Sequence, residues 1–94
     1  MPKTKTRKWD VATHLKTDRE MAAYINAALA EGDPGLVAAA LGDVARAKGM
    51  TGIARSAGLG RESLYKALSQ DGRPELATVM KVVSALGLRL TARV

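Results

Sequence analysis

The chain has 94 residues, which suit one domain with a single core, and its formal net charge of +6 fits a polyanionic partner. Cysteine is absent, which excludes disulfides and thiolate metal sites, and no apolar run approaches the length of a membrane span. The polar N-terminus lacks the apolar stretch of a signal peptide, so we expect a cytoplasmic protein that does not bind membranes.

Residues 1–16 are predicted to form a basic N-terminal arm, because positive side chains are frequent there and apolar residues follow no regular period. Within the arm, the run from Trp9 to Leu15 alternates apolar and polar residues imperfectly, which favours a short extended segment. Trp9 is expected either to cover the core or to anchor a partner. The arm itself could follow DNA phosphates, wrap around a partner, or only keep the protein in solution.

Residues 17–94 are predicted to form one helical domain, because alanine-rich apolar content favours helices. Thr17 or Asp18 can cap a first helix, which Gly32 is expected to end. Apolar residues at a three-and-four spacing predict its inner face, which comprises Met21, Ala22, Tyr24, Ile25, Ala28 and Leu29.

A second helix is predicted to begin at Asp33 and Pro34, since aspartate is a good cap and proline is well tolerated at the first helical position. Gly49 is expected to end this helix. Its inner side is predicted to hold Leu36, Val37, Ala40, Leu41, Val44 and Ala45. Residues 20–43, which span parts of both helices, contain acidic residues but no lysine or arginine.

Residues 50–69 can be aligned without a gap to the helix-turn-helix motif of DNA-binding proteins. The motif needs a small residue where its two helices cross, which is Ala54, and a residue that tolerates left-handed backbone in its turn, which is Gly58. Its apolar positions are occupied by Ile53, Ala57, Leu59, Leu64 and Ala67. We therefore predict helices over residues 51–57 and 61–68, although a generic amphipathic helix pair would meet several of the same requirements.

A turn at Asp71 and Gly72 is predicted to precede the last helix, which Pro74 opens and Gly87 ends. The buried stripe of this helix is predicted to be Leu76, Val79, Met80, Val83 and Leu86. Residues 88–94 then alternate apolar and polar side chains, which is the period of a strand. Such a strand must pair with the N-terminal segment, with its copy in a second chain, or with the sheet of a partner.

The second helix of a helix-turn-helix enters the major groove, so its outward residues are the candidate DNA contacts. They are Gly60, Arg61, Glu62, Tyr65, Lys66 and Ser69. Arg61 is the best candidate for base recognition, because its planar guanidinium can pair with both acceptors of a guanine. Lys66 better suits a phosphate, because an ammonium is a point charge. Phosphates on the walls of the groove are expected to be contacted by Thr51, Arg55 and Arg73.

Each of these residues also has a purely structural interpretation. Glu62 could accept from a cytosine amino group, orient Arg61, or remain a solvated charge. Tyr65 could contact a thymine methyl or a phosphate, or pack against neighbouring aliphatic side chains. Arg61 could likewise be a solvated charge on an exposed helix, and Lys66 and Arg73 could be charges that only keep the protein in solution. His14 is the single histidine and has no second ligand type nearby, so we expect neither a metal site nor an enzyme, and no cofactor.

Four runs of the sequence resemble the addiction-module antidote proteins, the HigA-like antitoxins of bacterial type II toxin–antitoxin modules. These runs are AALAEGDP at residues 27–34, AAALGDVARAKGM at 38–50, GLGRESLYKALS at 58–69 and ATVMKVVSALGL at 77–88. The resemblance implies an all-α fold, a five-helix phage-repressor-like helix-turn-helix domain, to which this chain adds the basic arm and a short C-terminal strand. It further implies a homodimer that binds double-stranded operator DNA and represses its own operon. Its cognate toxin would be of the RelE/ParE type and would be neutralised by direct contact.

Two features depart from the pattern of that family. Gly60 stands where the family often has a hydroxyl residue that caps the recognition helix, and the chain is basic where many antitoxins carry acidic segments. If the toxin is basic, the acidic residues within 20–43 are expected to contact it. The alternatives are a stand-alone phage-type or chromosomal transcriptional repressor without a toxin partner, and an interaction module that keeps this fold without recognising DNA.

Overall fold

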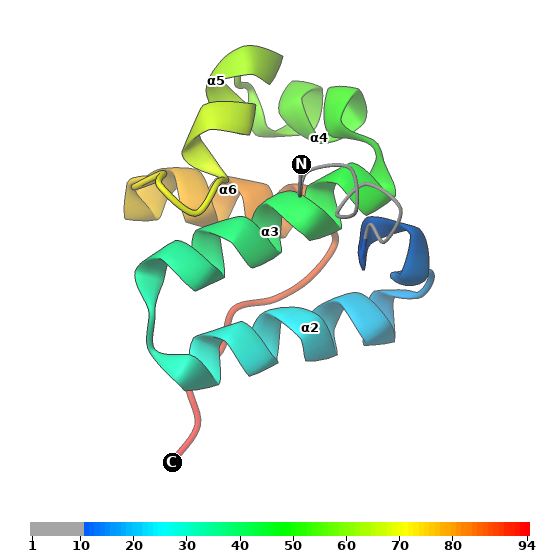
Figure 1. Cartoon of the computed structure of the whole chain (residues 1–94). Helices are drawn as coiled ribbons and strands as arrows, with labels where there is room; N and C mark the ends of the chain where they lie inside the picture. The colour runs from blue at the N-terminus through cyan, green and yellow to red at the C-terminus, as the bar shows by residue number, and fades with distance from the viewer. Residues whose placement is uncertain (1–10) are drawn as a thin grey trace, which may run out of the picture.

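The structure, a computed structural model, describes residues 11–94. Its helices are η1 (Val11–His14), α2 (Asp18–Glu31), α3 (Pro34–Lys48), α4 (Met50–Ala57), α5 (Arg61–Ala67) and α6 (Leu76–Ala85). Helices α2 and α3 pack together as a hairpin, α4 and α5 lie at one end of the molecule beyond α3, and α6 passes behind α3 to contact α4 (Figure 1). For the described residues, the prediction of an all-α fold with five α-helices is confirmed.

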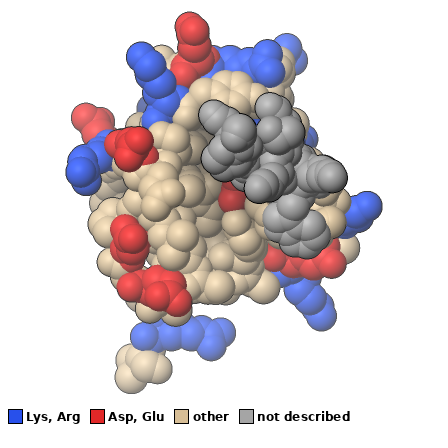
Figure 2. Space-filling view, viewed as in Figure 1, with Lys and Arg blue, Asp and Glu red and all other residues tan. Residues whose placement is uncertain are grey.

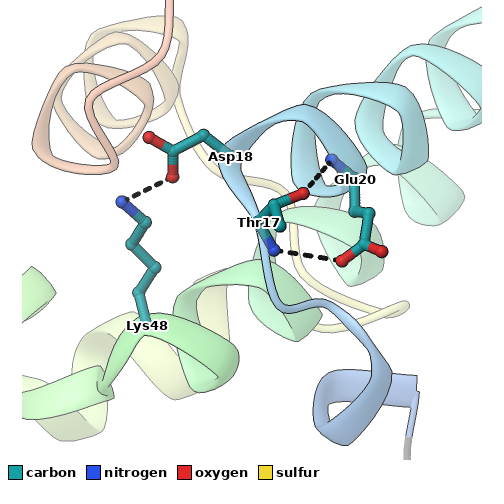
Figure 3. Close-up of polar contacts among 4 residues, drawn as sticks. All are labelled: Thr17, Asp18, Glu20 and Lys48. Atoms are coloured by element: carbon teal, nitrogen blue, oxygen red, sulfur yellow. Dashed lines mark hydrogen bonds and ion pairs between the residues drawn. The ribbon is translucent and has the colours of Figure 1, made fainter.

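The helix ends follow the capping residues of the sequence. The Thr17 hydroxyl accepts a hydrogen bond from the Glu20 N–H at 3.1 Å, and the Glu20 carboxylate accepts one from the Thr17 N–H at 3.0 Å (Figure 3). The same carboxylate accepts a hydrogen bond from the Lys16 N–H at 2.7 Å. This reciprocal capping box satisfies N–H groups at the start of α2 that have no partner within the helix. Asp33 caps α3 in the same way, because its carboxylate accepts from the Gly35 N–H at 3.0 Å. The predicted starts of both helices are therefore confirmed.

The capping box makes the stability of α2 dependent on pH. Hydrogen bonds from the Lys16 N–H and then the Thr17 N–H hold the pKa of the Glu20 carboxyl below its ordinary value of 4.5. Because the pKa is lower in the folded chain, the stabilising contribution is complete above the unfolded value and is lost as the pH falls through the folded value. The native chain should have a higher free energy of unfolding than Glu20→Ala near neutral pH. We expect this difference to become smaller as the pH falls from the unfolded pKa of Glu20 through its folded pKa. Urea denaturation at a series of pH values measures it, and a constant difference would contradict the assignment.

The core is formed by side chains of α3, α4, α5 and α6. Its most completely buried large side chains are Leu41, Val44, Leu64, Val82 and Leu86. Helix α2 closes one side through its own buried residues Met21, Ile25 and Ala28. Polar contacts join the two helices of the hairpin as well, since the Tyr24 hydroxyl donates to Asp43 at 2.5 Å and Lys48 forms a 3.0 Å ion pair with Asp18 (Figure 3).

Four apolar residues predicted to face inward lie on the surface instead. Leu29 is 43% exposed and Leu36 is 38% exposed, although both lie on the predicted inner faces of α2 and α3. On α6, Leu76 and Met80 are 70% and 57% exposed, and Val82, absent from the predicted stripe, is fully buried. Helical spacing identifies residues that share a face, but the width of the buried part of that face depends on the neighbouring helices. The four exposed residues belong to three different helices, α2, α3 and α6.

The two segments predicted to be extended are not strands in this chain. Residues 11–14 form the 3-10 helix η1, which packs on α3, whereas Trp9 lies outside the described residues. Residues 88–94 form neither helix nor strand, so the predicted C-terminal strand is not present. The physical reason is that a strand needs a neighbour for its backbone hydrogen bonds. Leu88 instead packs against the core, and its N–H donates to the Val83 carbonyl at 3.1 Å. Within residues 11–94, no helix is both long and apolar enough to span a membrane.

Candidate nucleic-acid interface

Helices α4 and α5 form a compact pair at one end of the molecule. Helix α4 buries Met50, Ile53, Ala54 and Ala57, which gives it a continuous apolar face towards the core. The chain then turns at Gly58, whose φ of 71° lies in the left-handed region, as the sequence predicted. The Leu59 N–H donates to the Ala54 carbonyl at 2.9 Å and closes this turn. The predicted limits of the two helices agree with the observed ones to within one residue.

Helix α5 is attached to the core by one face only. Leu64 is 1% exposed and Leu68, just beyond the helix, is 5% exposed, so these two side chains hold α5 down. Ala67 is half-buried, and the other side chains of the helix face solvent, namely Arg61, Glu62, Ser63, Tyr65 and Lys66. Helix α5 therefore presents a polar ridge at the end of the molecule.

Arg61 and Tyr65 form a pair on this ridge. The guanidinium carbon of Arg61 lies 5.5 Å from the centroid of the Tyr65 ring, which is within the range of a cation–π contact. The ring is 42% exposed, so it can orient the guanidinium while both groups stay accessible.

A shallow hollow of about 590 Å³ lies beside the ridge. Thr51 and Gly52 of α4 line it together with Arg61 and Tyr65 of α5. Its other walls come from distant parts of the sequence, with Ala12, Thr13, Arg46 and Ala47 contributed by η1 and α3. Lysine and arginine side chains gather at this end of the molecule (Figure 2).

Arg46 is a cation of this hollow that sequence reasoning did not assign to the site. Its Nη2 atom lies 3.1 Å from a carboxylate oxygen of Asp43, one turn earlier on α3. Asp43 therefore offsets part of its charge, and Arg46 is 35% exposed at its side chain. The sequence signal was the cluster of basic residues from Arg46 onward, but only the packing of α3 beside α4 brings Arg46 to Thr51.

Comparison with known proteins was informative at the level of the family. Residues 5–94 match the sequence model of a family described as probable addiction module antidote protein. The chain belongs to that family. It is also 53% identical over 81 residues, 86% of this chain and 84% of the relative, to an uncharacterized protein of Haemophilus influenzae (strain ATCC 51907 / DSM 11121 / KW20 / Rd). No solved structure matches. The predicted resemblance to antidote proteins is confirmed, and membership implies a cognate toxin as partner.

The antidote does not bring all of its predicted DNA-contact residues together. Lys66 is exposed on the last turn of α5 and belongs to the ridge, whereas Arg55 is exposed on the last turn of α4. Ser69 is half-buried, and its hydroxyl donates to the Lys66 carbonyl at 3.0 Å. Arg73 lies in the α5–α6 connection and lines a different hollow. Gly60 precedes α5 in extended backbone, and no side chain caps the helix there.

Proposed function

We propose that this antidote is a HigA-like, DNA-binding antitoxin with a phage-repressor-like helix-turn-helix. It binds the major groove of its own operator as a dimer, represses its operon, and neutralises a cognate RelE/ParE-type toxin. The observation that supports DNA binding best is the outward ridge of α5, held on the core by Leu64 and Leu68 and carrying Arg61, Tyr65 and Lys66. An exposed helix with arginine at its first turn suits a groove that admits one helix.

Different side chains of the ridge contact bases and phosphates. Arg61 pairs with a guanine, and the cation–π contact with Tyr65 limits the orientations of its guanidinium. Glu62, next to it, accepts from a cytosine amino group or keeps Arg61 in position. Lys66 contacts a phosphate, and Thr51 and Arg55 do so from α4 on the adjoining wall of the groove.

The base-reading role of Arg61 predicts a loss that depends on sequence. Arg61→Ala should weaken operator binding by about 1–3 kcal/mol and relax the preference at one base pair. Lys66→Ala is the matched control, because loss of a phosphate contact should weaken all DNA evenly and lower the salt slope by about one. Fluorescence anisotropy with operator and random duplexes over a salt series measures both effects. Equal losses for Arg61→Ala on the two duplexes would contradict base reading.

The dimer and the toxin can be tested in one set of experiments. A dimer should protect two half-sites separated by roughly one helical turn of DNA in a footprint of the upstream region. Co-expression with the product of the neighbouring gene should yield a stable complex and restore growth that this product inhibits alone. If the chain binds DNA but forms no such complex, the result would favour a stand-alone repressor. If it forms the complex but has no preferred DNA site, the result would favour an interaction module.

A further inference from the structure

A second hollow lies between the end of α2, the start of α3 and the start of α6. Its volume is about 390 Å³ and its walls are mainly apolar, with Leu29, Pro34, Val37, Pro74 and Val79 among the lining residues. We call it the apolar hollow. None of the residues that line the groove-facing ridge of α5 contributes to it. It is therefore a separate surface of the antidote.

One residue of the lining, Leu29, has a large exposed apolar side chain, and three further exposed apolar residues lie within two positions of lining residues in the sequence. Leu29 and Leu36 are 43% and 38% exposed, and Leu76 and Met80 are 70% and 57% exposed. All four belong to the helix ends that form the hollow, namely the last turn of α2 and the first two turns of α3 and α6. A cluster of large apolar side chains on one surface is typical of a protein–protein interface.

Four acidic residues are close sequence neighbours of residues that line the apolar hollow. Glu31 and Asp33 flank Gly32 in its wall, Asp71 precedes the lining residue Gly72, and Glu75 follows the lining residue Pro74. All four carboxylates are on exposed residues, whereas Arg73 is the single basic residue of the lining. Figure 2 shows acidic side chains beside uncharged surface on the side of the molecule where α2 turns into α3. The surface around the apolar hollow therefore has more acidic than basic residues, whereas basic residues predominate at the α4–α5 end.

We infer that the apolar hollow is the docking surface for the toxin, and that the toxin presents apolar side chains bordered by lysine and arginine. This inference rests on the proposed function for the existence of a toxin, but the surface itself selects the chemistry of the partner. Apolar side chains would be buried in the hollow and supply most of the affinity, while the carboxylates around it attract and orient a basic protein.

A second copy of the antidote fits this surface poorly. A two-fold dimer through the apolar hollow would place the same patch on both sides of the interface. The acidic residues of one copy would then face those of the other, and like charges across an interface are unfavourable.

The apolar part of the inference is tested with exposed residues, so the fold is not disturbed. In the full chain, Leu76→Ser and Met80→Ser change exposed residues within two positions of the lining residues Pro74 and Val79. The control pair is Ala92→Ser and Val94→Ser, which are also exposed and line neither this hollow nor the adjoining one that shares Leu29. The probe is the purified product of the neighbouring gene, titrated by isothermal calorimetry. We expect the first pair to raise its Kd by about tenfold or more and the control pair to leave it within about twofold.

The role of the four acidic residues is tested by removing two carboxylates. Glu31→Gln with Glu75→Gln is compared with Asp18→Asn and Glu62→Gln, which remove two charges elsewhere; Asp33 is kept because it caps α3. Glu75 makes no side-chain cap bond, so its replacement leaves α6 unchanged. Glu31→Gln with Glu75→Gln should lower the association rate constant with the toxin and make that rate constant less dependent on salt concentration. The control pair should change neither property.

The outcomes separate this inference from the proposed function. Toxin binding that survives Leu76→Ser with Met80→Ser overturns the inference and leaves the antitoxin function intact. A change of oligomeric state in that variant, seen by light scattering, also overturns it, because the hollow would then join copies of the antidote. If the native chain does not bind the probe at all, both fail. Operator binding unchanged by the same variant supports a docking role distinct from DNA.

Discussion

Gly42→Ala should destabilise the antidote strongly although it adds a single methyl group. Gly42 is buried in the middle of α3, and a Cβ there would overlap the backbone carbonyl oxygen of Leu68 and press on the Leu68 side chain. A backbone carbonyl cannot turn away as a flexible side chain can, so α3 or the end of α5 must move. Overpacking of this kind costs about 1–3 kcal/mol and occasionally more. Thermal and urea denaturation measure the loss.

Gly52→Ala is the matched control for this prediction. Gly52 lies within α4, and a Cβ at that position would meet no atom within 4 Å. Alanine is the better helix former, so this variant should be equally stable or more stable by about 0.5–1 kcal/mol. If Gly42→Ala were as stable as Gly52→Ala, the close approach of α3 to the end of α5 would be wrong.

Leu64→Ala should loosen the ridge that we propose to bind DNA. Leu64 is 1% exposed and is the single fully buried side chain of α5. Its truncation leaves a cavity and removes the main apolar contact of a helix of seven residues. Losses for buried leucines are about 2–5 kcal/mol, and a helix this short has little stability of its own. We therefore expect lower global stability together with weakened operator binding.

Two measurements separate the stability effect from a contact with DNA. Hydrogen exchange should show that amides of α5 lose protection in Leu64→Ala more than those of α2, because the cavity lies directly beneath α5. Leu76→Ala carries the same substitution at a residue that is 70% exposed, and it should change the free energy of unfolding by less than about 0.5 kcal/mol. Equal destabilisation of the two variants would contradict the burial of Leu64.

The parts of the fold that the sequence predicted well are those set by local chemistry. Thr17, Asp33 and Gly58 act within one turn of their own position, as caps or as a left-handed residue, and each behaves as predicted. Leu64 was identified as buried because the apolar positions of α4 and α5 follow a strict spacing. Such features depend little on the rest of the chain.

The errors have a common cause, which is that they depend on contacts between distant segments. Leu76 and Met80 have helical spacing with the core residues of α6, but both side chains remain exposed. Arg46 reaches the candidate interface only because α3 packs against α4. Arg73 follows α5 closely in sequence, yet the α5–α6 connection carries it to the apolar hollow. Periodicity alone cannot give these positions.

The length of α3 has a consequence for how the antidote could hold two macromolecules. Pro34 at its first residue borders the apolar hollow, and Ala47 near its last residue borders the hollow beside α5. A helix of 15 residues spans about 22 Å, so it acts as a rigid spacer between the two ends. Operator and toxin would then occupy opposite poles of one protomer without competing for area. The toxin would then not displace the operator directly. Repression of the operon would end when the antidote itself is lost, or when toxins bound to neighbouring protomers clash and force the dimer off the DNA.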